Sequence, residues 1–271
     1  MNDLRIAVAV TRAVVGRVKD NLDRVRRWTK AAKSQGAALI CFPEMNVTGY
    51  FNHNEIRGMA EPVPGSISRN LLKIAVEENI VVLAGMAERS ASDNIHASHL
   101  VVNPDGYVGV YRKLHIAPPE KKYLTAGPDI PLFNISGYTF GIQLCYDAHF
   151  PELTTQMALK GADVIFLPHA SPRGNSEDKF KSWMRHLPAR AFDNGLYIVA
   201  CNQTGENERG LSFPGIALVI NPSGDVLKKE INGDETIIIA DLKQEAIEQV
   251  RHHDMRYFLP NRRTDIYNPG G

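Results

Sequence analysis

The sequence predicts a single α/β domain in which β-sheets are buried beneath helices. Short, almost uniformly apolar runs of strand length alternate along the chain with stretches of helical periodicity. This alternation is typical of sheets whose faces are covered by helices. No linker, charge block or low-complexity segment divides the 271 residues. We therefore expect one domain over residues 1–271, with a polar C-terminal tail at about 253–271.

The first half of the chain predicts strands and helices in alternation and then a hairpin. The helix after the first strand places Leu22, Val25, Trp28 and Ala32 on one stripe, as a 3.6-residue period requires. Asn103-Pro-Asp-Gly106 is a turn sequence that joins two strands. The expected elements are a strand at 4–10, a helix at 17–33, a strand at 38–42, a helix at 66–78, a strand at 80–88 and hairpin strands at 96–103 and 106–112.

The second half predicts the same kinds of element. A second turn of the same type, Asn221-Pro-Ser-Gly224, lies 118 residues after the first. The similar strand-rich surroundings of the two turns suggest two related halves. The expected elements are a strand at 138–145, a helix starting at Pro151, a strand at 164–168, a helix at about 178–194, a strand at 196–202, strands near 213–220, 225–229 and 235–240, and a helix near 242–252.

Composition limits the classes of function. The formal net charge is +1, which argues against nucleic acid or an acidic membrane as the main partner. The basic stretch 17–33 is an alternative signal for an anionic surface, although such runs are usually the solvated face of a helix. No apolar stretch reaches the length of a membrane span. The N-terminus is a poor signal peptide, and three scattered cysteines fit a reducing cytoplasm.

Two candidate catalytic residues follow apolar strands. Cys145 comes after Gly141-Ile-Gln-Leu, just before a helix start at Pro151, and open α/β folds bind ligands at such strand ends. Its ordinary alternative is a small buried hydrophobic residue. Glu44 follows the strand at 38–42, where a carboxylate can serve as a general base. Its alternative is a loop hydrogen bond.

Two further candidates follow the first hairpin. Lys113 lies in Tyr111-Arg-Lys-Leu-His115, and Glu120 lies seven residues later. Alone, each is an ordinary surface charge, which is the usual place of Lys and Glu. No pair of Cys or His residues has the spacing of zinc ligands, and we expect no metal and no organic cofactor.

Together these segments carry a family resemblance. FPEMNVTGY, YRKLHIAPPEKKYLTAGPD and GIQLCYDAHFPE, in this order, resemble the three signature segments of the nitrilase superfamily of carbon–nitrogen hydrolases. The separations are similar too, with 69 residues from Glu44 to Lys113 and 32 from Lys113 to Cys145. The resemblance covers almost the whole chain and ends at Arg262-Arg-Thr-Asp-Ile-Tyr267.

The resemblance implies a four-layer αββα sandwich of two stacked six-stranded sheets. It implies Cys145 as nucleophile, Glu44 as general base, Lys113 as the cation beside the tetrahedral intermediate and Glu120 as a second, positioning carboxylate. The backbone N–H of Tyr146 would share the oxyanion with Lys113. It also implies a homodimer or larger homo-oligomer, built on helices at about 151–160 and 178–194 and on the C-terminal tail.

The residues around the nucleophile indicate a branch. Cys145-Tyr-Asp147 resembles the amidase branches, whereas nitrilases usually carry Cys-Trp-Glu. N-carbamoyl amidases share the Cys-x-Asp pattern and remain an alternative. An ω-amidase is disfavoured, because Ala148-His149 stands where that branch often has Arg. A nitrile substrate and a binding-only relative are less favoured still.

Several residues are candidates for substrate binding. Tyr50, His149, His169 and Arg173 are expected near the pocket. An arginine can hold a substrate carboxylate in a bidentate manner, and the equally weighted alternative for Arg173 is a surface residue in a flexible loop. Phe213 is a further candidate, whereas Trp183 is better explained as helix core. The expected function is hydrolysis of a small primary amide to carboxylate and ammonia through a Cys145 thioester.

Overall fold

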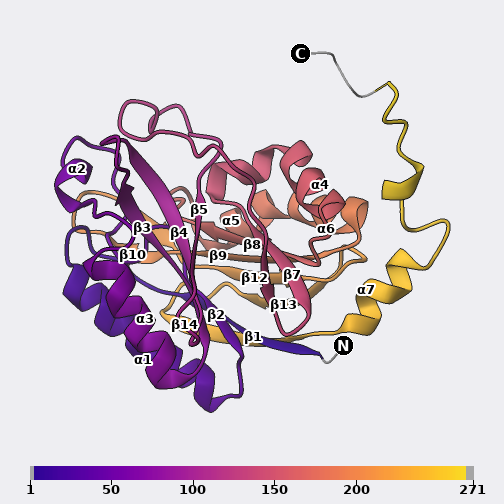
Figure 1. The fold of residues 1–271 in the computed structure, drawn as a ribbon, viewed down its shortest axis with the longest axis horizontal. Coiled ribbons are helices and arrows are strands. Elements are labelled where there is room, and N and C mark those ends of the chain that lie inside the picture. The colour runs from indigo at the N-terminus through magenta and orange to yellow at the C-terminus, as the bar shows by residue number, and fades with distance from the viewer. Residues whose placement is uncertain (1–2, 267–271) are drawn as a thin grey trace.

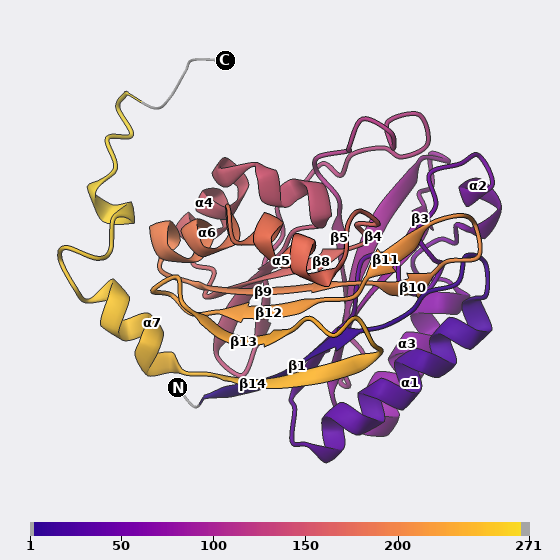
Figure 2. The same cartoon turned by 180° about the vertical axis from the view of Figure 1, so that it is seen from behind.

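Two six-stranded sheets lie face to face, and helices cover their outer sides. The computed structural model of the chain describes residues 3–266. Figure 1 and its reverse view in Figure 2 show the order of layers as helix, sheet, sheet and helix. The predicted four-layer sandwich is confirmed.

The first sheet takes most of its strands from the N-terminal half. Its central strands β1 (Leu4–Val10), β2 (Leu39–Cys41) and β3 (Val81–Arg89) are parallel, and the neighbouring pairs outside them are antiparallel. Helices α1 (Val18–Ser34) and α3 (Ser66–Glu78) cover its outer face, and the short α2 (Ile56–Met59) lies in the loop after β2. In sheet order the strands are β14 (Thr236–Leu242), β1 (Leu4–Val10), β2 (Leu39–Cys41), β3 (Val81–Arg89), β4 (Ile95–Val102) and β5 (Val108–Arg112).

The second sheet repeats this plan. Helices α4 (Pro151–Leu159) and α6 (Leu187–Asn194) lie on its outer face. Helix α5 (Ser176–Trp183) precedes α6 along the chain. A small separate ribbon pairs β10 (Thr204–Glu206) with β11 (Ser212–Pro214). In sheet order the strands are β13 (Val226–Glu230), β12 (Ala217–Ile220), β9 (Tyr197–Asn202), β8 (Val164–His169), β7 (Tyr138–Ile142) and β6 (Phe133–Ile135).

The two sheets are built alike. In each, three parallel strands are followed by an antiparallel pair, so that β1-β2-β3-β4-β5 corresponds to β7-β8-β9-β12-β13. The corresponding hairpins carry the two Asn-Pro-x-Gly turns. The two related halves suggested by these turns are therefore confirmed by the topology.

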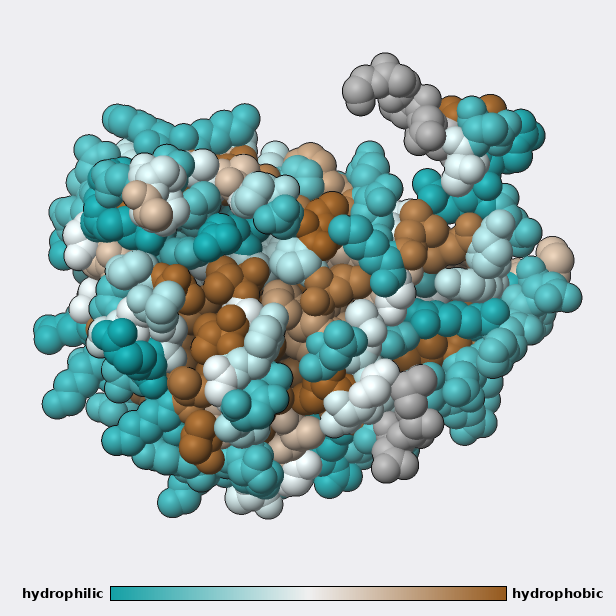
Figure 3. All heavy atoms as spheres, in the orientation of Figure 1, coloured by the Kyte–Doolittle hydropathy of each residue, from teal (hydrophilic) through white to brown (hydrophobic). Residues whose placement is uncertain are grey.

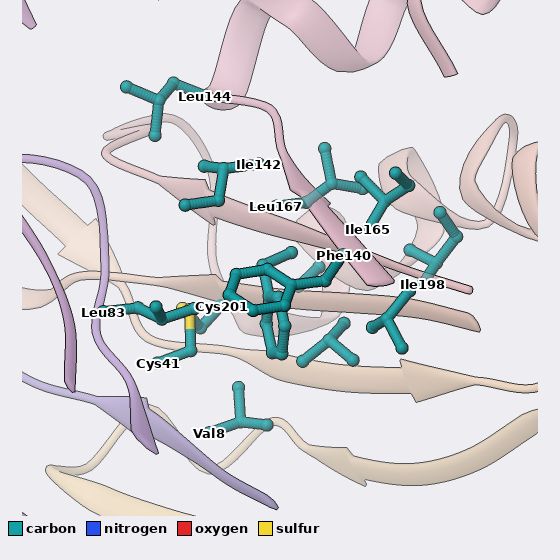
Figure 4. Packing of buried hydrophobic residues seen from close by; sticks show 14 of the residues in the cluster. Val8, Cys41, Leu83, Phe140, Ile142, Leu144, Ile165, Leu167, Ile198 and Cys201 are labelled. Atoms are coloured by element: carbon teal, nitrogen blue, oxygen red, sulfur yellow. The ribbon is translucent and has the colours of Figure 1, made fainter. Parts of the chain in front are cut away.

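The core has separate layers because successive strand residues point to opposite faces. Along β1, Ile6 and Val8 pack between the sheets, whereas Ala7 and Ala9 pack against α1 and α3. Figure 4 shows the layer between the sheets, where the buried side chains of the two sheets meet. Apolar residues on both faces explain the uniformly apolar strand sequences.

Two predicted elements are divided in the structure. The helix expected at 178–194 is two helices, α5 and α6, separated by a turn at residues 184–186. Pro188 lies in the first turn of the second helix, which begins at Leu187, and it has no N–H to continue the first helix. The strand expected at 213–220 is likewise β11 and β12, because Gly215 takes a positive φ of 56° between them.

In the second half of the chain, one strand ends earlier than predicted, whereas the predicted helix start at Pro151 agrees with the structure. The strand expected at 138–145 ends at Ile142, and residues 145–149 form a 3-10 helix. The helix start at Pro151 is confirmed. A final helix, α7 (Gln244–Arg251), precedes the tail. Residues 267–271 of the predicted tail lie outside the described residues.

The surface carries both apolar and hydrophilic side chains. Figure 3 shows apolar side chains gathered in the middle of one face, with hydrophilic side chains around them. Within residues 3–266, no helix combines the length and apolar character that a membrane crossing requires.

Candidate active site

The candidate residues come from the ends of strands in both sheets. Glu44 follows β2, Lys113 follows β5 and Cys145 follows β7. The halves correspond, so the segment after β8 is the counterpart of the one that carries Glu44. These two segments meet, because the N–H of Ala170 donates to Glu44 Oε2 at 3.0 Å. The stacking of related halves therefore gathers residues that are far apart in the sequence.

Lys113 lies at the centre of the site. Its ammonium Nζ is 2.9 Å from Glu44 Oε1 and 3.0 and 2.9 Å from the two oxygens of Glu120. All three side chains are buried. Burial lowers the pKa of Lys113, but the charges of Glu44 and Glu120 outweigh burial and raise it overall. Lys113 is therefore held as a cation between two carboxyl groups.

Glu120 is fixed from several sides. Besides Lys113, its oxygens accept hydrogen bonds from the Tyr50 hydroxyl at 2.7 Å and from the Ala117 N–H at 3.0 Å. The Tyr50 backbone carbonyl accepts from Asn207 at 3.0 Å, and its ring meets Phe213 edge-on at 6.3 Å. These contacts suit a role for Glu120 in positioning Lys113. Tyr50 thus contacts Glu120 directly, whereas Phe213 contacts Tyr50.

Glu44 has the electrostatics of a general base. Burial raises the pKa of its carboxyl group to about 7, against the opposing effect of Lys113. Its backbone carbonyl accepts a hydrogen bond from the Gln203 side chain at 2.7 Å. A carboxyl group whose pKa lies near neutrality exchanges a proton readily at physiological pH.

Cys145 begins the 3-10 helix and is partly exposed, unlike the buried Cys41 and Cys201. Its φ is 41°, in the left-handed region that non-glycine residues rarely adopt. Burial of the sulfur, followed by the charge of Glu44, raises the pKa of its thiol to about 12, whereas Lys113 acts to lower it. The thiol is therefore protonated at neutral pH and needs a base.

Asp147 ties the Cys145 segment to the Lys113 segment. Its buried carboxylate accepts from the Leu144 N–H and the Tyr111 hydroxyl through Oδ2, and from the His115 N–H through Oδ1, each at 2.8 Å. His115 Nδ1 also lies 2.8 Å from Oδ1. One carboxylate thus fixes the loop before the nucleophile to the loop after Lys113.

The remaining predicted residues are spread around this centre. His169 is buried at the end of β8, where burial lowers its pKa to about 3, and it packs on Trp183 with ring centroids 4.6 Å apart. Trp183 is core, as expected. His149 is exposed and contacts the Tyr146 and His186 rings. Arg173 is exposed on the loop before α5.

Tyr146 is the second residue of the 3-10 helix. The first N–H groups of a helix lack partners within it, so its N–H is available for the oxyanion role that the family resemblance implies.

Sequence reasoning missed two functional candidates. In the sequence, Asp147 serves only to distinguish the amidase branches from nitrilases. Its position two residues after Cys145 is nevertheless a signal that it belongs to the site. Lys179 was overlooked because its helix is rich in charges and nothing in the sequence separates it from the exposed Lys181. The structure buries Lys179 and leaves it 8% exposed. Among residues 3–266, no group of three or more His, Cys, Asp or Glu residues is arranged to hold a metal ion.

Comparisons with known proteins identify the family of the chain. The family model described as carbon–nitrogen hydrolase matches residues 5–252. A nitrilase of Pyrococcus abyssi is 32% identical, over 91% of this chain and 92% of the relative. An N-carbamoylputrescine amidase of Oryza sativa subsp. japonica is 28% identical, over 92% and 88%.

The solved structures show the same fold. A mutant of the amidase from Nesterenkonia sp. AN1, with acrylamide added to its active-site cysteine, superposes with a TM-score of 0.83 at 24% identity and covers 97% of each chain. From the family match and the sequence relatives, the chain belongs to the carbon–nitrogen hydrolase family, within the nitrilase superfamily, and is a hydrolase of carbon–nitrogen bonds.

Proposed function

We propose that the protein is an amidase that hydrolyses a small primary amide to a carboxylate and ammonia through a Cys145 thioester. The observation that carries this proposal is the buried Lys113 ammonium between Glu44 and Glu120, beside the Cys145 thiol. A protonated thiol, a carboxylate base and a fixed cation are the three parts that acyl transfer from an amide needs.

The first half of the reaction forms the thioester. Glu44 takes the thiol proton of Cys145 as the sulfur attacks the amide carbon. The carbonyl oxygen becomes an oxyanion, which Lys113 and the Tyr146 N–H stabilise. The protonated Glu44 then gives its proton to the amide nitrogen, because an amide anion is a very poor leaving group. The carbon–nitrogen bond breaks, ammonia leaves and the acyl group stays on Cys145.

The second half releases the acid. Glu44 takes a proton from a water molecule as the water oxygen attacks the thioester carbon. The new tetrahedral oxyanion forms at the same place and uses the same donors. The carbon–sulfur bond then breaks, and the proton on Glu44 returns to the thiolate of Cys145. Glu120 holds Lys113 in place in both halves, and Tyr50 holds Glu120.

The alternative is an N-carbamoyl amidase, which releases ammonia and CO₂ by the same chemistry. The similarity to an N-carbamoylputrescine amidase supports it. The similarity to a nitrilase keeps nitriles as a third substrate class. The Cys145-Tyr-Asp147 sequence favours amides over nitriles.

The test is ammonia release from primary amides, N-carbamoyl amino acids and nitriles, with the Cys145→Ala variant beside the wild-type protein. Ammonia from amides that depends on Cys145 supports the proposal. Release from only one of the other two classes would replace it with that class. No release from any class, with a thiol that iodoacetamide does not alkylate, would contradict a catalytic role.

We also propose a homodimer or larger assembly. Leu159 on α4 and Phe192 on α6 are 46% and 43% exposed. The segment after α7 extends beside these helices as an arm (Figure 1), and its Met255 and Ile266 are 79% and 61% exposed. Exposed apolar side chains on neighbouring elements indicate an interface. Light scattering should give a multiple of the 30.1 kDa chain mass, and a monomer at micromolar concentration would contradict this.

A further inference from the structure

A second buried lysine lies beside the candidate site and has no acidic partner. Lys179, on α5, is 8% exposed, and its Nζ donates to Ser171 Oγ at 2.6 Å. Within the described residues 3–266, no carboxylate oxygen lies within 4.0 Å of this ammonium. By contrast, the exposed Lys181 on the same helix pairs with Glu177 at 3.7 Å.

The contact of Lys179 with Ser171 joins it to the segment that holds Glu44. Ser171 directly follows Ala170, whose N–H holds the Glu44 carboxylate. Asn202 fixes Ser171 through two hydrogen bonds to its backbone, at 2.9 and 3.0 Å. The charges of Lys179 and Cys145 are close enough to shift the pKa of each other. Lys179 is therefore on a rigid support at the edge of the site.

This cation lacks a counter-ion for a structural reason. Glu44 and Glu120 are already paired with Lys113, and the Asp147 carboxylate already accepts from the Tyr111 hydroxyl and from the Leu144 and His115 N–H groups. Burial lowers the pKa of Lys179, and the charge of Arg173 lowers it further. A buried ammonium without an anion is costly unless a partner arrives. Its bond to Ser171 uses one of its three N–H donors and leaves two for a ligand.

We propose that Lys179 binds a carboxylate of the substrate, so that the preferred substrates carry a terminal carboxamide or carbamoyl group and an anionic group a few bonds away. This inference rests on the proposed amidase function and specifies its substrate class. It assigns the anion to Lys179 on α5, a different position from Ala148-His149, where the sequence departs from the ω-amidase pattern. Arg173, exposed on the preceding loop, adds positive charge near Lys179. Lys179 is a specificity-determining residue, whereas Lys113 serves the reacting carbonyl.

A role in activating the thiol is the competing explanation. A cation that stabilises the Cys145 thiolate would help every substrate equally and would change the pH dependence of thiol alkylation. A carboxylate-binding cation would help only acidic substrates and would leave that pH dependence in place. The two roles therefore separate experimentally.

The experiment compares acidic amides with neutral isosteres. The acids are malonamate, succinamate and glutaramate, which differ by one methylene each. In each isostere, a methyl ketone replaces the carboxylate, as in 4-oxopentanamide for succinamate. Values of kcat and KM are measured for the wild-type protein, Lys179→Met and the matched control Lys181→Met. Lys179→Arg is included because it keeps the charge if Lys179→Met fails to fold.

The wild-type protein should prefer at least one acid over its isostere. Lys179→Met should lower that preference about 10- to 100-fold, the range for a hydrogen bond to a charged group, mainly by raising KM. Lys181→Met should keep the preference, and Lys179→Arg should keep part of it. Equal losses on acids and isosteres, with a shifted pH profile of iodoacetamide alkylation, would overturn the proposal in favour of thiol activation.

A binding measurement separates this inference from the proposed function. Calorimetric titration of the Cys145→Ala protein with the same acids needs no turnover. Binding that Lys179→Met weakens supports the carboxylate site even if the wild-type protein releases no ammonia. Hydrolysis of neutral amides, with no effect of Lys179 on the binding of any acid, overturns the inference and leaves the proposed function standing.

Discussion

Replacing Lys113 by methionine removes the cation that lies between Glu44 and Glu120 while keeping a side chain of similar length. Three N–O contacts of 2.9 to 3.0 Å are lost, and two carboxyl groups remain buried without their counter-ion. Removal of one partner from a buried ion pair costs about 3–5 kcal/mol. Uptake of a proton by one carboxyl group offsets part of this, so we expect a loss of about 3 kcal/mol in the free energy of unfolding.

The catalytic effect has a separate magnitude. Loss of one oxyanion donor lowers kcat about 10²- to 10³-fold. In the wild-type protein, the charge of Lys113 acts to lower the pKa of Glu44. Without Lys113, that pKa should therefore rise above its value of about 7. The acid limb of the kcat/KM profile should therefore move to higher pH.

The assay is ammonia release against pH at saturating and limiting amide, with urea denaturation for stability. Lys121→Met is the matched control, since Lys121 is exposed on the same loop. An unchanged kcat with a raised KM would show that Lys113 binds substrate and transition state equally. An unchanged kcat and KM would refute the reasoning altogether.

Four further predictions concern the groups around Lys113. Cys145→Ala and Cys145→Ser should both lose turnover and keep their circular dichroism spectra; activity near wild type in either would remove Cys145 as nucleophile. Since the base acts deprotonated, kcat/KM should rise with pH through a single ionisation near 7, the pKa of Glu44, and a profile that is flat from pH 5 to 9 would contradict this. Tyr50→Phe removes the 2.7 Å hydrogen bond to Glu120. Because a hydrogen bond to a charged group contributes about 1.5 kcal/mol, kcat should fall roughly tenfold. Steady-state kinetics that match the wild type would show that Glu120 does not need this hydrogen bond. In urea denaturation, Cys145→Gly should be more stable than Cys145→Ala by about 1 kcal/mol. Glycine adopts the positive φ of 41° without the energetic penalty that left-handed backbone imposes on other residues. The opposite order of stability would show that the backbone at residue 145 is not strained.

Most strands and helices were predictable because their signals are local, whereas the four-layer arrangement followed only from the family resemblance. Apolar runs marked the strands, and the two Asn-Pro-x-Gly turns marked the corresponding hairpins. Two errors came from glycine and proline effects that depend on context. The pattern places Pro188 within one helix, although it lies in the first turn of a new helix that begins at Leu187. Gly215 was read as part of a strand, although its positive φ separates two.

The site was predictable to a different degree. The three motifs named Glu44, Lys113, Glu120 and Cys145, because residues that react are held in short characteristic segments. Lys179 was not predictable, because its proposed role depends on burial and on the absence of a neighbouring carboxylate within the described residues. Both are properties of the packed structure, and a lysine in an amphipathic helix is usually exposed.

The charges of the site suit a reaction that moves charge without creating it. Glu44, Glu120 and Lys113 together carry a net charge of −1 when Glu44 is ionised, and the Cys145 thiol is neutral. In the proposed acylation, a proton passes from sulfur to Glu44, and the negative charge appears on the carbonyl oxygen. Lys113 then faces the oxyanion in place of the Glu44 charge and keeps Glu120 as its second partner. Because the total is constant, a buried site need not stabilise an additional charge, which would be costly at low dielectric. The raised pKa values of Cys145 and Glu44 follow from the same cause, since burial disfavours a second anion until the amide carbon is attacked.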